Sequence, residues 1–451
     1  SNYIMYTNYM SWQKKLFFGL LGGVILVVLL IVAVAKFGQK KEPITITYWG
    51  LWEPEEVIEP LIAEFETVHP DIKVNYVFQS QREYRERLQN ALSQGRGPDV
   101  FRIHNTWLPM FKSELSPVPF TEFESIYPPV VSYDFRLGSN YMAVPLMYDG
   151  LALYTNDELF DQGGKTIPTS WEELRKTAVE LSVCDSVDGR CTRGDKILIS
   201  GAAMGTADNV DHWQDVLGII MMQNNVNLSL PQGQSAEESL QYYTIFNRAD
   251  HVWDSTLPSS TSMFAAGKLA MYFAPSWRVF EIKETNPKLK FSVHPLPQLP
   301  LDISRGEKPT TWATYWAEGV SKKSQNTTAA WEWVKFLSSK ESLTKMYQTA
   351  SGIREFGEIY PRIDMQASLI NAPYVGPVVS QVANARSWYL TGFTFDGPTG
   401  INTKISNYFA DAINSINQGR QPSEVTKTLS AGVNQVLSQY GLATQLAAPA
   451  N

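Results

Sequence analysis

The chain has 451 residues, of which 44% are hydrophobic and 18% charged, and it carries 13 Trp, 21 Tyr and 21 Phe. This length is too great for one ordinary hydrophobic core and fits two or three domains. The formal net charge of −7 gives no basic surface for nucleic acid, so we expect no nucleic-acid partner.

The first predicted element is an apolar segment at 16–35, LFFGLLGGVILVVLLIVAVA, which has no charged residue. As a helix it would be about 30 Å long, the thickness of the hydrocarbon core of a bilayer. We expect a single-pass transmembrane anchor after a tail at 1–15 and before a linker at 36–43, with the binding domain outside the cytoplasm. A cleaved signal peptide is the alternative, because AVA at 33–35 fits a cleavage site. The protein would then be secreted or periplasmic.

The residues after the linker alternate between strand and helix patterns. Three segments read as strands: ITITYW at 44–49, DIKVNYVF at 71–78 and PDVFRI at 98–103. The segments between them, 55–69 and 82–95, carry apolar residues at helical spacing. This order predicts an α/β fold with a parallel sheet, in which ligands bind beyond the carboxyl ends of the strands. The loops after the first and third strands are therefore candidate binding segments.

The second half of the chain also alternates between strand and helix patterns, with longer connections between them. AVPLMYDGLALYTN at 143–156 predicts two short strands, and Ser170 with Glu173 forms a capping box that starts a helix. Further elements are expected as helices at 211–225, 326–339 and 405–419, as a helix end and strand within 264–273, and as a strand within 290–297.

The only two cysteines, Cys184 and Cys191, lie in the segment CDSVDGRC. Asp188-Gly189 is a strong turn signal that would bring the two sulfur atoms together. In an exported protein we expect a disulfide between them. A reduced pair in a surface hairpin is the alternative.

No motif for catalysis or cofactor binding is present. The five histidines are scattered without a metal-binding spacing, and the chain has no Walker A motif, nucleophile elbow or dinucleotide fingerprint. We therefore expect a protein that is not an enzyme and that has no cofactor and no metal.

Aromatic residues recur beside polar residues at the ends of predicted elements. Sugars need such pairs, because they present an apolar C–H face for stacking and hydroxyl groups for hydrogen bonds. Any one ring could belong to a core, but seven such places favour a shared cleft. They are Trp52-Glu53, Asn105 with Trp107, Tyr148-Asp149, Trp213 beside Asp211 and Asn209, Ser276-Trp277, Tyr315-Trp316, and Trp388.

From about residue 44 to its end, the chain resembles the bacterial extracellular solute-binding proteins of the maltose-binding-protein-like group, the sugar receptors of ABC importers. The matching segments are ITITYWGLWE, HPDIKVNY, GRGPDVFRI, AVPLMYDGLALYTNDELF, IPTSWEELRKTAVEL, FAAGKLAMYFAPSW and PLP. The resemblance implies a two-lobe, periplasmic-binding-protein-like (type II) α/β fold with discontinuous lobes. The implied parts are lobe 1 at 44–147 plus about 312–355, lobe 2 at 148–311 plus about 356–440, and a tail at 441–451.

The resemblance also implies which residues contact the ligand. They are Trp52, Glu53, Asn105, Trp107, Tyr148, Asp149, Asn209, Trp213, Trp277, Trp312, Tyr315 and Trp388. In TTWATYWAEG, the second strand that crosses between the lobes, we expect Tyr315 and Trp312 to face the cleft. Trp316 would point into a lobe core, because neighbours on a strand alternate sides.

The implied function is that of an extracytoplasmic, monomeric receptor. It would bind a mono- or oligosaccharide between two closing lobes and deliver it to ABC permease subunits that a separate ATPase drives. One feature departs from the family pattern: no cysteine lies directly after the apolar segment, the first being Cys184, so the expected tether is the protein span and not a lipid.

Three other functions remain open. A receptor for a polyamine or another small cationic solute predicts that several carboxylates line the cleft, in place of amides and one or two acids. An enzyme acting on polysaccharide would use Glu53 or Asp149, with a second carboxylate within about 5 to 10 Å. A surface-anchored sensor or adhesion module would use the same fold without transport.

Overall fold

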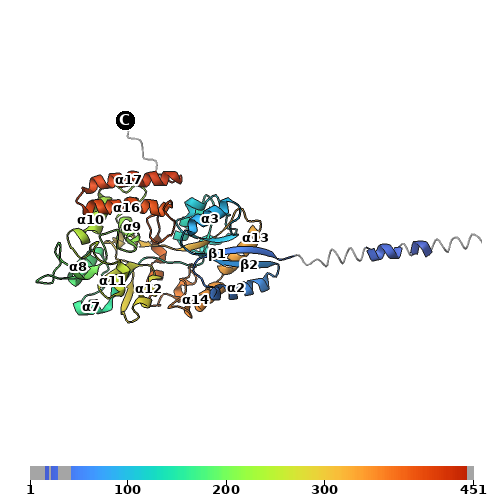
Figure 1. Ribbon diagram of the computed structural model, residues 1–451, viewed down its shortest axis with the longest axis horizontal. Helices are drawn as coiled ribbons and strands as arrows, with labels where there is room; N and C mark the ends of the chain where they lie inside the picture. The colour runs from blue at the N-terminus through green and yellow to red at the C-terminus, as the bar shows by residue number, and fades with distance from the viewer. Residues whose placement is uncertain (1–15, 20–21, 29–41, 444–451) are drawn as a thin grey trace, which may run out of the picture.

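The computed structural model, which describes residues 16–19, 22–28 and 42–443, contains two α/β lobes, each built around a five-stranded sheet. In Figure 1 the first lobe, with β1, β2, α2 and α13, lies at the opposite end of the folded part from α7, α8 and α10 of the second. The two-lobe α/β fold predicted from the sequence is confirmed.

The sheet of the first lobe has the strand order β2-β1-β3-β13-β6. Its strands are β1 (Ile44–Gly50), β2 (Ile72–Phe78), β3 (Val100–His104), β6 (Val144–Pro145) and β13 (Trp316–Val320). β1 pairs in parallel with β2 and β3, as the sequence predicted. β13, which comes from far along the chain, pairs antiparallel with β3 and β6.

Helices cover the first sheet because their apolar residues face it. They are α2 (Glu55–Val68), α3 (Tyr84–Ser93), α13 (Thr327–Leu337) and α14 (Lys340–Ser351). α2 buries Val57, Ile58, Leu61 and Phe65, which lie at the helical spacing that the sequence showed. Val68, at the end of the helix, is instead 66% exposed, so the apolar face stops one turn early.

The sheet of the second lobe has the order β11-β7-β10-β9-β8 and mixes parallel and antiparallel pairs. Its strands are β7 (Ala152–Asn156), β8 (Val183–Cys184), β9 (Ile197–Ala202), β10 (Leu269–Ala274) and β11 (Phe291–His294). Every residue of β7 and β10 is buried, as expected for central strands with helices on both faces.

The helices of the second lobe include the one predicted to start at Ser170. They are α7 (Asp157–Gly163), α8 (Trp171–Leu181), α9 (Trp213–Gln223), α10 (Gln234–Arg248), α11 (Ser260–Ala265) and α12 (Arg278–Thr285). The Ser170 side chain accepts from the N–H of Glu173, and the Glu173 carboxylate accepts from that of Ser170, which confirms the capping box. α16 (Ile401–Asn417) and α17 (Pro422–Gln439) pack against α10 at the top of Figure 1.

The remaining elements are short. They are α4 (Leu108–Phe111), α5 (Phe123–Ile126), α6 (Pro129–Phe135), β4 (Arg136–Leu137), β5 (Asn140–Tyr141), η1 (Ile303–Arg305), β12 (Thr311–Trp312), η2 (Gln366–Ser368), α15 (Gly376–Gln381), η3 (Val382–Asn384) and β14 (Ala385–Arg386).

Within the described residues, the chain passes between the two lobes three times: from β6 to β7, from β11 to β13, and after α14. The crossing segments bond to one another through bridges from Tyr148 to Ile359 and from Gly150 to Ala313, and through the β12–β14 pair. A Cβ on Gly150 would lie 2.5 Å from the carbonyl oxygen of Trp312, so this approach requires glycine. The residue bounds assigned to the two lobes stay a prediction.

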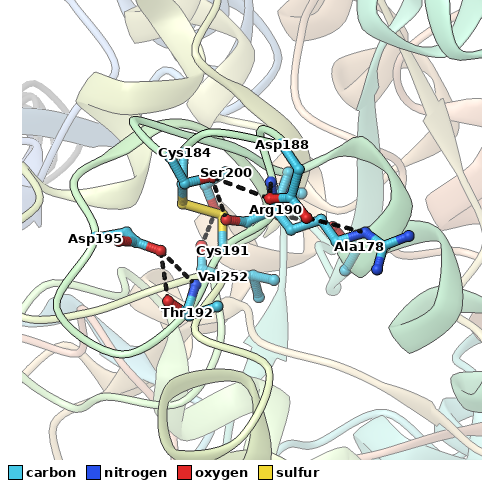
Figure 2. Close-up of a disulfide and its surroundings, with 12 residues drawn as sticks. Ala178, Cys184, Asp188, Arg190, Cys191, Thr192, Asp195, Ser200 and Val252 are labelled. Atoms are coloured by element: carbon cyan, nitrogen blue, oxygen red, sulfur yellow. Dashed lines mark hydrogen bonds and ion pairs between the residues drawn. A yellow bond between two sulfur atoms is a disulfide. The ribbon is translucent and has the colours of Figure 1, made fainter.

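A disulfide joins Cys184 and Cys191, as predicted, at an S–S distance of 2.00 Å (Figure 2). The predicted turn closes it: the N–H of Cys184 donates to the carbonyl oxygen of Gly189 at 3.0 Å, and that of Arg190 donates to the Asp188 carboxylate at 3.1 Å. Gly189 has a φ of +74°, which glycine adopts without steric strain.

The transmembrane prediction at 16–35 lies partly outside the described residues. In the part of the chain that the structure describes, no helix has the length and apolar character needed to cross a bilayer.

Candidate ligand-binding site

A cavity of about 400 Å³ lies where the crossing segments meet the two lobes. Five of the residues predicted to contact ligand line it: Trp52, Tyr148, Asp149, Trp277 and Tyr315. The other lining residues are Gln81, Met147, His212, Pro275, Phe280, Glu281, Glu284, Thr314, Trp316, Arg354, Glu358, Gly392, Phe393 and Phe395. The cavity is therefore rich in aromatic rings, with polar groups among them, as expected of a small-molecule site.

The first lobe contributes one aromatic wall, formed by Trp52 and Trp316. Trp52 follows β1, and its ring meets that of Trp316 edge-to-face at a centroid distance of 5.2 Å. Behind Trp52, the guanidinium carbon of Arg102 on β3 lies 4.9 Å from the ring centroid. Trp316 was expected to point into the lobe core. Its ring does reach His104 and Trp107, but it also lines the cavity.

Arg102 is held by two buried carboxylates. Its Nη1 donates to both oxygens of Glu53 at 2.6 Å, and its Nε donates to Glu318 at 2.7 Å. Burial opposes the charge of Arg102, but Glu318 and Glu53 outweigh it and raise its pKa well above the usual value. Glu53, which was predicted to contact ligand, instead has its carboxylate bonded to Arg102 in this structure. The Glu53 side chain is 4% exposed and both of its oxygens face Arg102.

The second lobe contributes the opposite wall, formed by Trp277 and Phe393. Their rings meet edge-to-face at 5.7 Å, and the guanidinium carbon of Arg278 lies 4.3 Å from both ring centroids. Trp277 is 36% exposed and Phe393 38%. Exposed aromatic rings inside a cavity are typical of a ligand-binding surface.

Arg278, at the start of α12, is held more loosely than Arg102. Its Nε donates to Nε2 of His212 at 3.0 Å, and its Nη1 bonds the half-exposed Glu281. Its buried Nη2 has no hydrogen-bond partner among the described residues and lies 3.9 Å from Asp211. Burial lowers the pKa of His212, so a neutral imidazole accepts this bond.

Asp215 holds the loop that carries Phe393. Its carboxylate accepts from Thr391 Oγ1 at 2.5 Å, from the N–H of Gly392 at 3.1 Å and from Trp312 Nε1 at 2.7 Å. Trp312 is thus 1% exposed and lies outside the cavity lining, which corrects the expectation that it faces the cleft. Through its bond to Asp215, Trp312 helps to position the loop that carries Phe393 from outside the cavity.

Three cavity residues have left-handed backbone. His212, Phe393 and Phe395 have φ values of +60°, +54° and +54°. For residues with a Cβ this conformation costs about 1 to 2 kcal/mol each. Such strain concentrates at functional sites, and all three residues line the cavity.

The floor of the cavity is a pair of stacked tyrosines, Tyr148 and Tyr315, whose ring centroids are 5.6 Å apart. The Tyr315 hydroxyl donates to Asp134 at 2.6 Å, and Asn105 also donates to Asp134, at 2.9 Å. Burial raises the pKa of Asp134 to about 6. Asn105, predicted to contact ligand, instead lies beneath the floor and holds Tyr315.

Asp149 links a crossing segment to the second lobe. It accepts from the N–H and Oγ of Ser276 at 3.0 and 2.8 Å and from the N–H of Gly150 at 2.7 Å. Burial raises its pKa to about 7. Because Ser276 directly precedes Trp277, this carboxyl group also holds the backbone from which the Trp277 side chain extends.

Four other residues predicted to contact ligand lie outside the cavity lining. Trp107 is fully buried against Phe111. Trp213 is buried at the start of α9. Asn209 uses its side chain within the second lobe, bonding Trp253 Nε1 and the carbonyl oxygens of Asp254 and Leu257. Trp388 packs near Phe409 of α16.

Sequence reasoning predicted Asp149 but missed Phe393, Phe395, His212 and the other acidic residues of the cavity. These are Glu281, Glu284 and Glu358, which lie beside one guanidinium, that of Arg354, and one amide, that of Gln81. The segment TGFTFDGPTG at 391–400 carries a signal that could have found the loop, because two phenylalanines among three glycines are unusual for a core segment. Within the described residues, no group of His, Cys, Asp and Glu side chains is placed to hold a metal ion.

Comparison with known proteins gives a consistent result. The family model described as "Bacterial extracellular solute-binding protein" matches residues 52–343. The diacetylchitobiose binding protein DasA of Streptomyces coelicolor is 21% identical over 54% of this chain and 58% of its own length. The multiple sugar-binding protein of Streptococcus mutans is 22% identical over 77% of this chain and 85% of its own.

Solved structures share the fold at low sequence identity. A cyclo/maltodextrin-binding protein complexed with maltotetraose superposes with a TM-score of 0.69 at 16% identity, covering 88% of this chain and 98% of that one.

Proposed function

Because the chain belongs to the bacterial extracellular solute-binding protein family, as its sequence predicted, we propose that it is the carbohydrate receptor of an ABC importer. One observation carries the proposal: the cavity has an aromatic wall from each lobe, Trp52 with Trp316 and Trp277 with Phe393. Opposed rings suit the two faces of a sugar. The names of the relatives, which bind diacetylchitobiose or multiple sugars, support the same ligand class.

The sugar would lie on the tyrosine floor between the two walls. Trp52, Trp277 and Phe393 would stack on its rings, while Gln81 and Thr314 would bond hydroxyl groups. A ligand that touches both walls binds best when the lobes are closed, so it shifts the population toward the closed form. The protein acts by binding and release, in agreement with its membership of a solute-binding rather than an enzyme family.

The receptor would work outside the cytoplasm, as a monomer, with partner permease subunits and a separate ATPase. The segment at 16–35 would anchor it to the membrane, or would be cleaved to leave a secreted or periplasmic protein. The disulfide between Cys184 and Cys191 fits an oxidising compartment.

A thermal-shift screen of the purified chain against mono- and oligosaccharides, polyamines and amino acids tests the proposal. A ligand that binds only the native state, present at a hundred times its Kd, adds about 2.7 kcal/mol of stability. We expect a saccharide to raise the Tm and to stay intact afterwards. A shift with polyamines alone, or a saccharide that is cleaved during the assay, would refute the proposal.

A further inference from the structure

The segment 391–396, which forms part of the second wall, is tied to both lobes. Its first residues bond Asp215 on α9 of the second lobe. At its other end, the carbonyl oxygen of Asp396 accepts from Nε of Arg85 on α3 of the first lobe at 2.8 Å. The two lobes are therefore joined by a contact that does not use the crossing segments.

This contact lies directly beside the cavity. Gln81 of the first lobe and Phe395 of the second both line the cavity. Arg85 follows Gln81 at the start of α3, and Asp396 directly follows Phe395. The bond between Arg85 and Asp396 therefore brings the two lobes together at the rim of the cavity.

Arg85 is a buried and fully bonded arginine, not a solvated surface charge. It is 6% exposed. Within α3 its guanidinium donates to Glu86 at 2.9 Å and to Gln89 at 2.7 Å. Towards the second lobe it donates to the carbonyl oxygen of Asp396 and to the hydroxyl of Thr399. All three guanidinium nitrogens are thus in use, and two of them reach the segment that precedes α16.

A second bond between the same parts of the molecule lies close to the crossing segments. Thr106 Oγ1 donates to Oδ1 of Asn402 at 2.9 Å, and the His104 ring links Thr106 to Thr314 of a crossing segment. Among the described residues, α3 has no hydrogen bond to a crossing segment. We therefore expect a rotation about the crossing segments to separate the Arg85 contact more than the Thr106 contact.

We propose that Arg85 is a positioning residue of the binding site, because it clamps α3 to residues 396–399 and holds the two lobes in the closed arrangement. Arg85 does not line the cavity, so it acts on a ligand only through the position of the lobes. Hydrogen bonds from a charged group are stronger than neutral ones, and opening the lobes would break them. The clamp thus shifts the population toward the closed form. This inference goes beyond the proposed function and does not depend on which solute binds.

Small-angle X-ray scattering of the purified chain without added solute tests the clamp. Arg85→Ala removes both bonds to the second lobe, so we expect the ratio of closed to open molecules to fall about tenfold. The radius of gyration should then exceed that of the wild type. Thr399→Val removes one acceptor from the opposite side and should increase the radius by less. Because Thr399 is exposed, this variant tests the clamp even if Arg85→Ala does not fold.

Arg87→Ala is the matched control. Arg87 lies on the same helix and carries the same charge. Among the described residues, its guanidinium donates to Gln79 and to the carbonyl oxygens of Ser80 and Arg82, all in the first lobe. The radius of gyration of this variant should equal that of the wild type. A thermal melt of each variant checks that it folds.

Two results would overturn the inference. If no folded variant at Arg85 or Thr399 has a larger radius of gyration than the wild type, the lobes are held together without this contact. If Arg87→Ala expands the protein as much as Arg85→Ala does, the change follows from the loss of a positive charge on α3 and not from the clamp. Neither result bears on whether the cavity binds a saccharide.

Discussion

The two walls of the cavity use the same device in different settings. Each places a buried arginine behind a tryptophan ring: Arg102 behind Trp52 and Arg278 behind Trp277. Arg102 lies on a sheet strand and is neutralised by two buried carboxylates. Arg278 lies at a helix start, where its partners are a neutral histidine and a half-exposed glutamate.

The backbone that carries the two walls also differs, and again the first wall is held more firmly than the second. Trp52 and Trp316 belong to or directly follow strands of the first sheet, whereas Phe393 lies in a loop with left-handed backbone that Asp215 ties down. The first wall is thus part of the lobe core. The second is a surface assembled from helix ends and loops, where substitutions can change ligand preference without disrupting a sheet.

The sharpest way to break this comparison is to remove each arginine. Arg102→Met leaves Glu53 and Glu318 buried without their partner, so we expect it to lower the free energy of unfolding by about 3 to 5 kcal/mol. Arg278→Met removes the partner of Glu281, which water can solvate, and leaves Nε2 of the buried His212 without its donor, so it should cost about 1 to 2 kcal/mol. Urea denaturation of both variants measures the difference, and equal losses would contradict it.

The floor between the walls should be sensitive to pH. The pKa of Asp134 is raised by burial to about 6, so its native state binds a proton more tightly than the unfolded state. Protonated Asp134 therefore adds up to about 3 kcal/mol to the free energy of unfolding. This stabilisation is complete below about pH 4 and is lost as the pH rises through about 6.

The variant Asp134→Asn, which keeps the shape and can still bond Tyr315 and Asn105, isolates this effect. We expect the fall in unfolding free energy between about pH 4 and pH 6 to be shallower in the variant. Identical pH profiles for the two proteins would show that Asp134 does not titrate in this range.

A change remote from both walls supplies a reference. Replacing Cys184 and Cys191 together by serine removes the disulfide that closes the hairpin in Figure 2. The entropic model predicts a loss of about 2.5 kcal/mol for a loop of this length. Because no hairpin residue lines the cavity, ligand affinity should stay the same, and a weaker affinity would show that the hairpin reaches the site.

The smallest expected effect comes from two substitutions of Phe393 in the second wall, which distinguish the loss of its ring from the relief of its backbone strain. Phe393→Ala and Phe393→Gly both remove the ring, but only glycine relieves the left-handed backbone. We expect the glycine variant to be about 1 kcal/mol more stable than the alanine variant, with the same reduced affinity. If alanine is the more stable, the loop relaxes in the variant and the native strain is not imposed by Asp215.

The sequence predicted the parts of the site that follow from chain order. Trp52 after a parallel strand and Tyr148 and Tyr315 on crossing segments could be placed because strand ends and crossings converge in such folds. It could not distinguish Trp52 from Trp107, since both follow strands of one sheet. Trp107 is buried because its ring packs on Tyr84 and Trp316 as well as on Phe111, and the first two are tertiary contacts.

The misplaced polar residues have a similar cause. Glu53 and Asn105 occupy the loops expected to bind ligand, but Arg102 and Asp134 take up their hydrogen bonds. These partners are 49 and 29 residues away along the chain, so no local pattern reveals them. His212 was missed because its contact with Arg278, 66 residues further along the chain, is tertiary, whereas the glycine-rich segment around Phe393 carried a signal that was not used.

The central claim is that a saccharide is held between the two walls. Calorimetric titration of the wild-type chain, Trp52→Ala and Trp277→Ala with the saccharide that gives the largest thermal shift tests it most directly. We predict that each variant, one per lobe, loses about 1 to 3 kcal/mol of binding, roughly five- to 150-fold in Kd. An unchanged Kd in either variant would show that its wall does not contact the ligand, and the account of a site shared by both lobes would be wrong.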